Sequence, residues 1–125
     1  MDEHNHQRLI VAWFRSRYPD LDLLFFAIPN GGKRDPATAR RLKDEGVLPG
    51  VPDLLLAIPS GGYSGLFIEA KTRTGSASKA QKEVCAALAG QGYSVVVAKG
   101  YESMKAAITE YLDRPATTKI PKESI

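Results

Sequence analysis

The first apolar residues of the chain are spaced for one face of a helix. Within residues 2–18 they stand at i, i+1, i+4 and i+5, the repeat of a helix that buries a single stripe. We therefore expect a helix over this segment, ended by Pro19, because proline cannot continue a helical hydrogen-bond ladder. The side chains expected in its buried face are Leu9, Ile10, Trp13 and Phe14.

Four later apolar runs have the length of strands and are bounded by proline, glycine or polar residues. They are residues 23–28, 54–58, 66–70 and 94–98. A glycine-rich turn at residues 59–65 joins the second run to the third and predicts a β-hairpin. The last run is rich in β-branched residues, which predicts a strand buried on both faces.

Capping signals predict three further helices between and after these strands. An N-cap aspartate followed by proline favours a helix over residues 35–45. Ser78 and Gln81 form a capping-box pattern that opens a second helix, and Ser103 opens a third. The resulting order, α-β-α-β-β-α-β-α, predicts an α/β protein with a mixed central sheet flanked by helices.

Length, charge and cysteine count narrow the class of protein. The 125 residues fit one domain, expected over residues 1–113, with a polar C-terminal arm at residues 114–125 that we expect to pack against a partner subunit. A net charge of +3 is compatible with a polyanionic partner without establishing one. One cysteine excludes an intramolecular disulfide, and the short apolar runs predict no membrane segment, as expected of an intracellular protein.

The predicted hairpin brings acidic and basic side chains together. Glu69 and Lys71 are two residues apart on a strand and therefore share a face. With the turn centred near Gly62, antiparallel pairing places Asp53 opposite Lys71 and Leu55 opposite Glu69. The two acids and the lysine then lie on one face at one end of the hairpin.

Two carboxylates at one sheet end repel each other, and a divalent cation removes this repulsion. Mg²⁺ prefers oxygen ligands, so we expect Asp53, Glu69 and the carbonyl group of Ala70 to bind it. Such an ion polarises a phosphoryl oxygen and lowers the pKa of a bound water, while Lys71 orients the water or offsets charge on the phosphate. This arrangement predicts phosphodiester hydrolysis, and the alternative is a structural surface ion pair.

Pro52-Asp53 followed by Glu69-Ala70-Lys71 resembles the signature of the PD-(D/E)xK nuclease superfamily. More closely, nearly the whole chain is similar to the VRR-NUC (virus-type replication-repair nuclease) domain. Further positions that carry the resemblance are Glu3, Gln7, Pro29-Asn30-Gly31-Gly32, Arg34, Gly50-Val51, Phe67-Ile68, Ser78, Gln81 and Gly92-Tyr93.

The resemblance implies a restriction-endonuclease-like αβββαβ core and Mg²⁺- or Mn²⁺-dependent cleavage of DNA. It further implies a homodimer that acts on branched DNA such as Holliday junctions, in the cytoplasm of a bacterium or a phage-infected cell. By position, Asp53 and Glu69 would hold the metal and Lys71 would be the catalytic lysine. Glu3 would approach the metal through water, and Gln81 would support the site.

Basic residues flank the predicted site in two clusters. We expect them to contact the DNA backbone rather than to read base sequence, and the alternative is a solvated face. Glycine and serine near the second cluster suit the approach of backbone N–H groups to a phosphate. The expected contacts are Asn30, Lys33, Arg34 and Arg41 in the first cluster, and Arg73, Ser78, Lys79 and Lys82 in the second.

Other interpretations stay open or are disfavoured. A nuclease acting on flaps, single strands or linear duplex is an alternative, as is a catalytically silent DNA-binding module. His4-Asn5-His6 spells a nuclease motif but lacks later histidines, so an exposed helix start is expected. Cys85 is expected to pack in the core, and no phosphate-binding loop motif supports a nucleotide cofactor.

Overall fold

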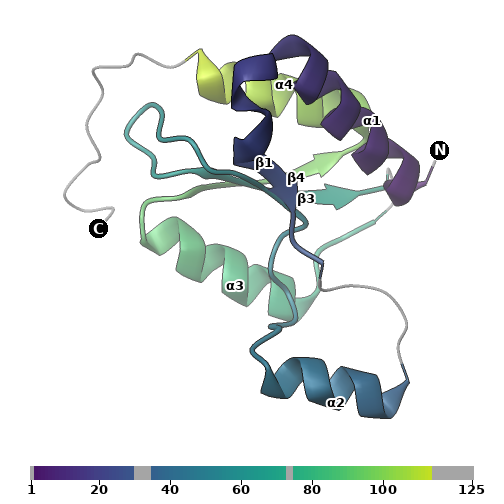
Figure 1. The fold of residues 1–125 in the computed structure, drawn as a ribbon. Coiled ribbons are helices and arrows are strands. Elements are labelled where there is room, and N and C mark those ends of the chain that lie inside the picture. Colours follow the sequence, from purple (N-terminus) through teal and green to yellow (C-terminus); the bar gives the residue numbers. More distant parts are fainter. Residues whose placement is uncertain (1, 30–34, 73–74, 114–125) are drawn as a thin grey trace.

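The described part of the chain alternates helices and strands in the predicted order. The computed structural model describes residues 2–29, 35–72 and 75–113 (Figure 1). Its elements are α1 (Glu3–Arg17), the 3-10 helix η1 (Pro19–Leu24), β1 (Phe25–Ala27), α2 (Pro36–Asp44), β2 (Leu54–Leu56), β3 (Leu66–Lys71), α3 (Lys79–Gly90), β4 (Ser94–Lys99) and α4 (Tyr101–Leu112). This order contains the expected αβββαβ core and confirms the α/β fold class.

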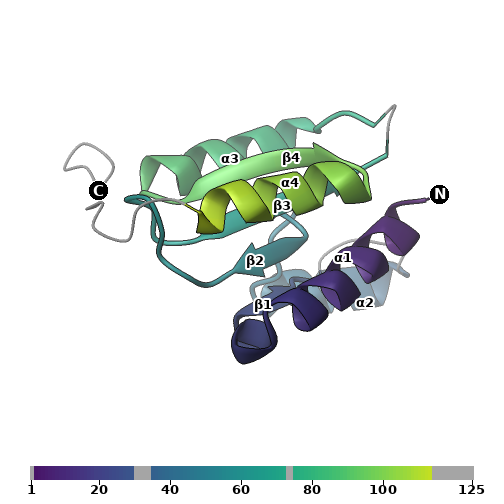
Figure 2. The same cartoon turned by 90° about the horizontal axis from the view of Figure 1, so that it is seen from above.

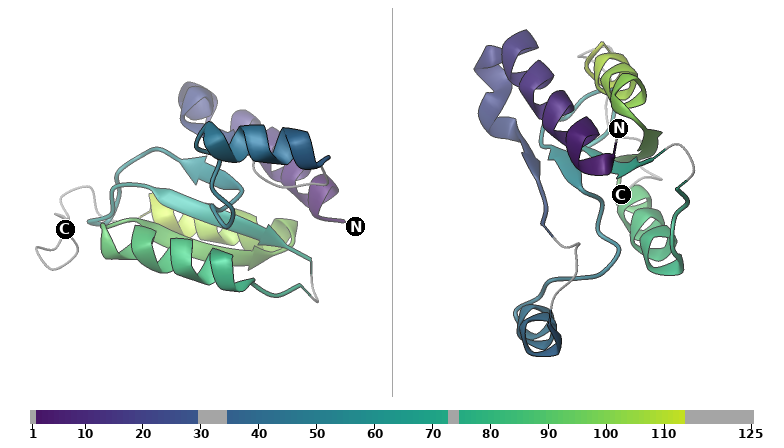
Figure 3. Two further views of the ribbon diagram at one scale, coloured as in Figure 1. Left: turned by 90° about the horizontal axis from the view of Figure 1, so that it is seen from below. Right: turned by 90° about the vertical axis from the view of Figure 1, so that its right-hand side faces the viewer.

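Within the described residues, four strands form one mixed sheet in the order β1-β2-β3-β4. The first three strands are antiparallel neighbours, and β4 runs parallel to β3. Helices α1 and α4 cover one face, α3 lies on the other, and α2 stands away from the sheet (Figures 1 and 3). No helix in the described ranges is long and apolar enough to cross a membrane.

The hydrophobic core lies between the sheet and the pair α1–α4. Alternate residues of β2 and β3 point toward these helices, because successive strand side chains face opposite sides of a sheet. The buried side chains of this core include Ile10, Phe14, Leu54, Leu56, Leu66, Ile68, Met104, Ile108 and Tyr111.

Two sequence predictions about burial are wrong in part. Leu9 is 36% exposed. The fully buried residues of α1 are Ile10 and Phe14, and Leu9 lies beside this narrow buried stripe on the helix surface. Val97 is 46% exposed, because β4 is an edge strand of the sheet and the helices that contact it do not cover this side chain fully.

The strand predicted at residues 23–28 is shorter than expected. Residues up to Leu24 belong to η1, which has Pro19 at its start, and only residues 25–27 pair with β2. Proline fixes φ near the helical value, and the N–H of Leu21 donates to the Tyr18 carbonyl. Leu23 and Leu24 therefore continue a 3-10 helix instead of beginning the strand. Leu23 is left 87% exposed.

His6 links α1 to the start of α4. Helix α4 begins at Tyr101 rather than at Ser103, and its N-cap, Gly100, has no side chain to cap it. Instead, Nδ1 of His6 accepts a hydrogen bond from the Tyr101 N–H at 2.8 Å. The expectation of an exposed histidine pair at the helix start is therefore wrong for His6, which is half-buried against Gly100.

Replacing His6 with alanine is expected to lower the free energy of unfolding by about 1 kcal/mol, the usual cost of losing a helix N-cap. Urea denaturation would measure the change. His4→Ala is the matched control, because His4 is exposed on the same helix and should change stability by less than about 0.5 kcal/mol. Equal effects of the two substitutions would contradict a capping role for His6.

Candidate active site

The register of the β2–β3 hairpin sets which residues meet at its open end. Leu55 is paired with Phe67, and Leu54 with Ile68. Continuing this register places Asp53 opposite Glu69, so the predicted pairs Asp53–Lys71 and Leu55–Glu69 are wrong by two residues. A shift of two residues leaves every side chain on its predicted face.

The shift has two local causes. The two-residue turn is Gly61-Gly62, both with positive φ, between the bridged residues Ser60 and Tyr63, so its centre lies before Gly62. In addition, three residues separate Leu56 from Ser60, but two separate Tyr63 from Leu66. The connection from β2 to the turn is therefore one residue longer than the connection from the turn to β3. Pro59 lies in the longer connection and has no N–H to donate to a paired strand.

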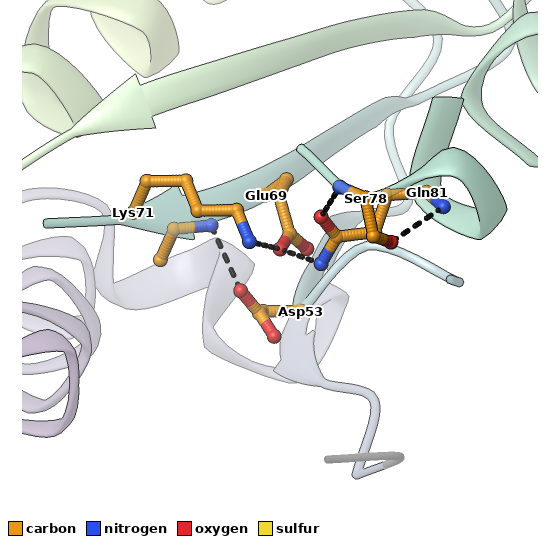
Figure 4. Close-up of polar contacts among 6 residues, drawn as sticks. Asp53, Glu69, Lys71, Ser78 and Gln81 are labelled. Atoms are coloured by element: carbon orange, nitrogen blue, oxygen red, sulfur yellow. Dashed lines mark hydrogen bonds and ion pairs between the residues drawn. The ribbon is translucent and has the colours of Figure 1, made fainter. Parts of the chain in front are cut away.

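Asp53 is fixed from both sides at the end of β2. Its carbonyl oxygen accepts a hydrogen bond from the Ile28 N–H at 2.7 Å, beyond the end of β1. Its side-chain Oδ2 accepts one from the Ala70 N–H at 2.8 Å (Figure 4). Because the N–H and C=O groups of one strand residue point to the same side, the Ala70 carbonyl also faces the Asp53 side of β3.

Glu69 is a buried carboxylate with one oxygen satisfied and one not. It is 3% exposed, and its Oε2 accepts a hydrogen bond from Nε2 of Gln81 at 2.6 Å. Nζ of Lys71 lies 3.2 Å from the same oxygen. Among the described residues, Oε1 is buried without a hydrogen-bond partner. Burial and the nearby Asp53 carboxylate raise the pKa of Glu69 from 4.5 to about 7, against the opposing effect of Lys71.

Gln81 is held in place by the start of α3. Its backbone N–H donates to Oγ of Ser78, and its Oε1 accepts from the Ser78 N–H, which confirms the predicted capping box. Both ends of the Gln81 amide are therefore used, one for the helix cap and one for Glu69 (Figure 4). The cap thereby fixes the orientation of the amide that holds the buried carboxylate.

These side chains line one cavity of about 580 Å³ together with the first turns of α1. The cavity brings together all five residues predicted to be catalytic. Its lining is Glu3, His4, Gln7, Ala27, Ile28, Pro29, Asp53, Glu69, Lys71 and Gln81. Gln7 had no predicted role, and His4 was expected at best near the metal, although the spacing of Glu3 and Gln7 by one helical turn could have placed both on one face.

The donors in the cavity fit a hard divalent cation. Within the described residues, no three His, Cys, Asp or Glu side chains are arranged to hold a metal by themselves. The available oxygens are the Asp53 and Glu69 carboxylates and the Ala70 carbonyl, and Mg²⁺ is commonly held by one or two carboxylates with water completing its shell. The unpartnered Oε1 of Glu69 is the buried oxygen that such an ion would satisfy.

The predicted DNA-contact residues differ in their surroundings. Arg41 lies on α2, away from the sheet, with its side chain 69% exposed and 4.0 Å from Glu45 (Figure 3). Lys79 and Lys82 are exposed in the first turns of α3, where Ser78 is the N-cap. The structure thus presents Arg41, Ser78, Lys79 and Lys82 to solvent. Asn30, Lys33, Arg34, Arg73 and the arm at residues 114–125 lie outside the described residues.

Glu69 is expected to destabilise the metal-free fold at neutral pH. Because its pKa is raised, folding binds a proton, so its stabilising contribution is complete below pH 4.5 and is lost as pH rises through about 7. Glu69→Gln should remove this dependence and raise the free energy of unfolding at pH 8 by on the order of 3 kcal/mol. Urea denaturation in EDTA at pH 5 and pH 8 would measure both effects. Glu83→Gln, an exposed change on α3, is the control, and parallel pH profiles of the wild type and Glu69→Gln would contradict the prediction.

Comparisons with known proteins agree with this fold. A family model described as the VRR-NUC domain matches residues 1–102. A solved structure titled "VRR_NUC domain protein" is 30% identical in sequence and superposes with a TM-score of 0.80, covering 97% of this chain and 98% of the other. A search of curated proteins found no match.

Proposed function

The chain belongs to the VRR-NUC domain family, a family of nuclease domains, and on that premise we propose that it is a magnesium-dependent endonuclease that hydrolyses phosphodiester bonds in branched DNA. The observation that supports hydrolysis is the meeting of Asp53, Glu69 and Lys71 in one cavity, with a buried carboxylate oxygen left unpartnered. A protein that only bound DNA would have no reason to place two acids where phosphates approach, because acids repel them.

Each residue of the cavity has a distinct task in this proposal. Asp53, Glu69 and the Ala70 carbonyl would hold Mg²⁺, or Mn²⁺ in its place, and the bound ion would supply a Lewis acid for the phosphoryl oxygen. Lys71 would orient the attacking water or accept its proton, and its charge would offset the negative charge that builds up on the phosphate. Gln81 would keep the Glu69 carboxylate aimed into the cavity.

Glu3 is proposed to act from α1. It shares the cavity with the acids, although the structure shows no three-carboxylate cluster among the described residues. This separation suits an indirect contact, in which Glu3 accepts a hydrogen bond from a water at the metal rather than binding the metal itself.

A homodimer acting on branched DNA completes the proposal. The cavity provides one set of Asp53, Glu69 and Lys71 in each chain. A four-way junction needs two symmetric cuts, so two chains related by a two-fold axis would supply both sites. The mild positive charge of the chain is consistent with a DNA partner.

The test is a cleavage panel. Four-way junction, flap, nicked, single-stranded and linear duplex DNA would each be incubated with the protein in Mg²⁺, Mn²⁺ or EDTA. We expect cutting of the junction with either metal and none in EDTA, with paired nicks at symmetric positions.

The other outcomes decide between alternatives. Preferred cutting of flaps, single strands or linear duplex would show that the protein is a nuclease whose substrate is not branched DNA. Tight junction binding without cleavage under any metal would favour a silent DNA-binding module. Cleavage in EDTA at the Mg²⁺ rate would overturn metal dependence, and a monomer on the junction by analytical ultracentrifugation would overturn the dimer.

A further inference from the structure

The outer side of α1 carries a groove next to the candidate active-site cavity. The groove has a volume of about 310 Å³, and its described lining is His4, Gln7, Arg8, Val11, Ala12 and Arg15. His4 and Gln7 also line the cavity that contains Asp53 and Glu69. The groove therefore adjoins the cavity and extends away from it along the helix. Helix α1 lies at the outside of the molecule in the view from above (Figure 2).

The charge of the groove suits a phosphate backbone. Arg8 and Arg15 are exposed, and within the described part of the chain neither forms an ion pair. No acidic side chain is among its described lining residues. The corresponding hollow on α4 has the opposite character, because three acids line it against one base, Lys105. The acids are Glu102, Glu110 and Asp113. A polyanion leaving the cavity would therefore be attracted along α1 and repelled from α4.

The spacing of the groove residues lets both arginines contact one nucleic-acid strand. Arg8 and Arg15 are seven residues apart, a rise of about 10 Å along the helix. A strand winds around its axis as well as rising by about 3.4 Å per nucleotide, so its successive phosphates are farther apart than this rise, and two arginines about 10 Å apart reach phosphates that are close neighbours on the strand. Val11 and Ala12 between the arginines are small, which lets a strand approach the helix closely.

We propose that the groove on α1 binds the backbone of the substrate strand on one side of the cut, with Arg8 and Arg15 each contacting a phosphate. This inference rests on the proposed nuclease function and extends it from the cut itself to the path of the DNA. Arg8 and Arg15 lie on α1, outside the two basic clusters predicted from the sequence. The contacts are to phosphates, so they would strengthen binding without selecting base sequence.

The first experiment measures salt dependence. Binding of a fluorescein-labelled four-way junction would be followed by anisotropy in EDTA at several salt concentrations, for the wild type, Arg8→Gln and Arg15→Gln. Each substitution should reduce the slope of log K against log [salt] by about 0.9, the value for one phosphate contact. Lys105→Gln is the control, because it removes the same charge from the acidic hollow on α4 and should leave the slope unchanged.

The second experiment locates the contact. Uncharged methylphosphonate linkages would be placed one at a time along the cut strand, on either side of the cleavage position. We expect positions on one side only to weaken binding of the wild type, and two closely spaced positions to lose their effect in Arg8→Gln and Arg15→Gln respectively.

The outcomes separate this proposal from the proposed function. Cleavage of the same junction by the wild type in Mg²⁺ tests the nuclease alone. Suppose that the wild type cleaves but the two arginine variants keep its salt slope and its methylphosphonate pattern. The proposal that DNA binds along α1 would then be wrong, and the proposed nuclease function would be supported. If the wild type neither binds nor cleaves any substrate of the panel, both proposals are overturned. Circular dichroism of each variant would confirm that α1 remains folded.

Discussion

Replacing Lys71 with methionine is expected to reduce DNA cleavage by about two to four orders of magnitude, the usual contribution of a group that moves or positions a proton. Methionine keeps most of the length of the side chain and removes its charge. Lys71 is largely buried, at 14% exposure, and its Nζ is 3.2 Å from Oε2 of Glu69. The cation is therefore positioned at the buried carboxylate, where it offsets negative charge that would otherwise raise the pKa of Glu69 further.

Two measurements separate this role from a structural one. Cleavage rates at saturating DNA should fall, while the affinity for the junction in EDTA should change by less than about threefold, because one phosphate contact is the most that Lys71 supplies to binding. Lys105→Met is the control, since Lys105 lies over the rings of Trp13 and Tyr101 on the other side of the sheet. A Lys71→Met protein that cleaves within threefold of the wild-type rate would show that Lys71 is not catalytic.

The features that the sequence predicted well are those set by short-range chemistry. The capping box of Ser78 and Gln81 depends on residues three apart, and it appears as expected. The shared face of Glu69 and Lys71 follows from the two-residue period of a strand, whatever its partner. The resemblance added the order of the core, which the solved relative confirms.

Features set by contacts between distant segments were predicted less well. The hairpin register depends on one extra residue between Leu56 and Ser60, and neither hydrophobic alternation nor glycine content reveals such a residue. The capping of α4 by His6 joins residues 95 positions apart, and nothing near His6 in the sequence announces it. Exposure of Val97 follows from the place of β4 at the sheet edge, which is a property of the topology.

The residues of the cavity also divide into those that could be placed from nearby sequence and those that depend on contacts between distant segments. Asp53 and Glu69 could be placed together from the hairpin alone, because a loop and two strands bring them there. The contribution of α1 required the tertiary structure, since the packing of Ile10 and Phe14 against the sheet decides which side of the helix faces the acids. His4 and Gln7 line the cavity because of how α1 packs, and their residue types alone do not indicate this position.

Gly50→Ala is expected to have the largest effect on stability, a loss of about 2 to 5 kcal/mol. Gly50 has φ of +95°, where an L side chain is strained by about 1–2 kcal/mol. A Cβ there would also lie 2.5 Å from the carbonyl oxygen of Ala80, in the first turn of α3. This backbone contact cannot yield as a flexible side chain could, so the loop and the helix must move apart, at a further cost of about 1–3 kcal/mol.

That movement would separate the two halves of the cavity. The loop leads directly to Asp53, whereas α3 carries Gln81, which holds Glu69. A displacement of about 1 Å between reacting groups can cost about a hundredfold in rate, so cleavage by the folded fraction of Gly50→Ala should fall by at least tenfold. Urea denaturation and single-turnover cleavage would measure the two effects separately.

Gly46 provides a matched control for Gly50. Its φ is +99°, nearly the same strained conformation, but a Cβ there would meet no atom within 4 Å. Gly46→Ala should therefore lower the free energy of unfolding only through backbone strain, by about 1–2 kcal/mol. Its cleavage rate should stay within about twofold of the wild-type rate. The difference between the two variants measures the close approach of the loop to α3. Equal losses of stability and activity would show that this approach does not hold Asp53 against the Glu69–Gln81 pair, and that backbone strain alone accounts for the glycine.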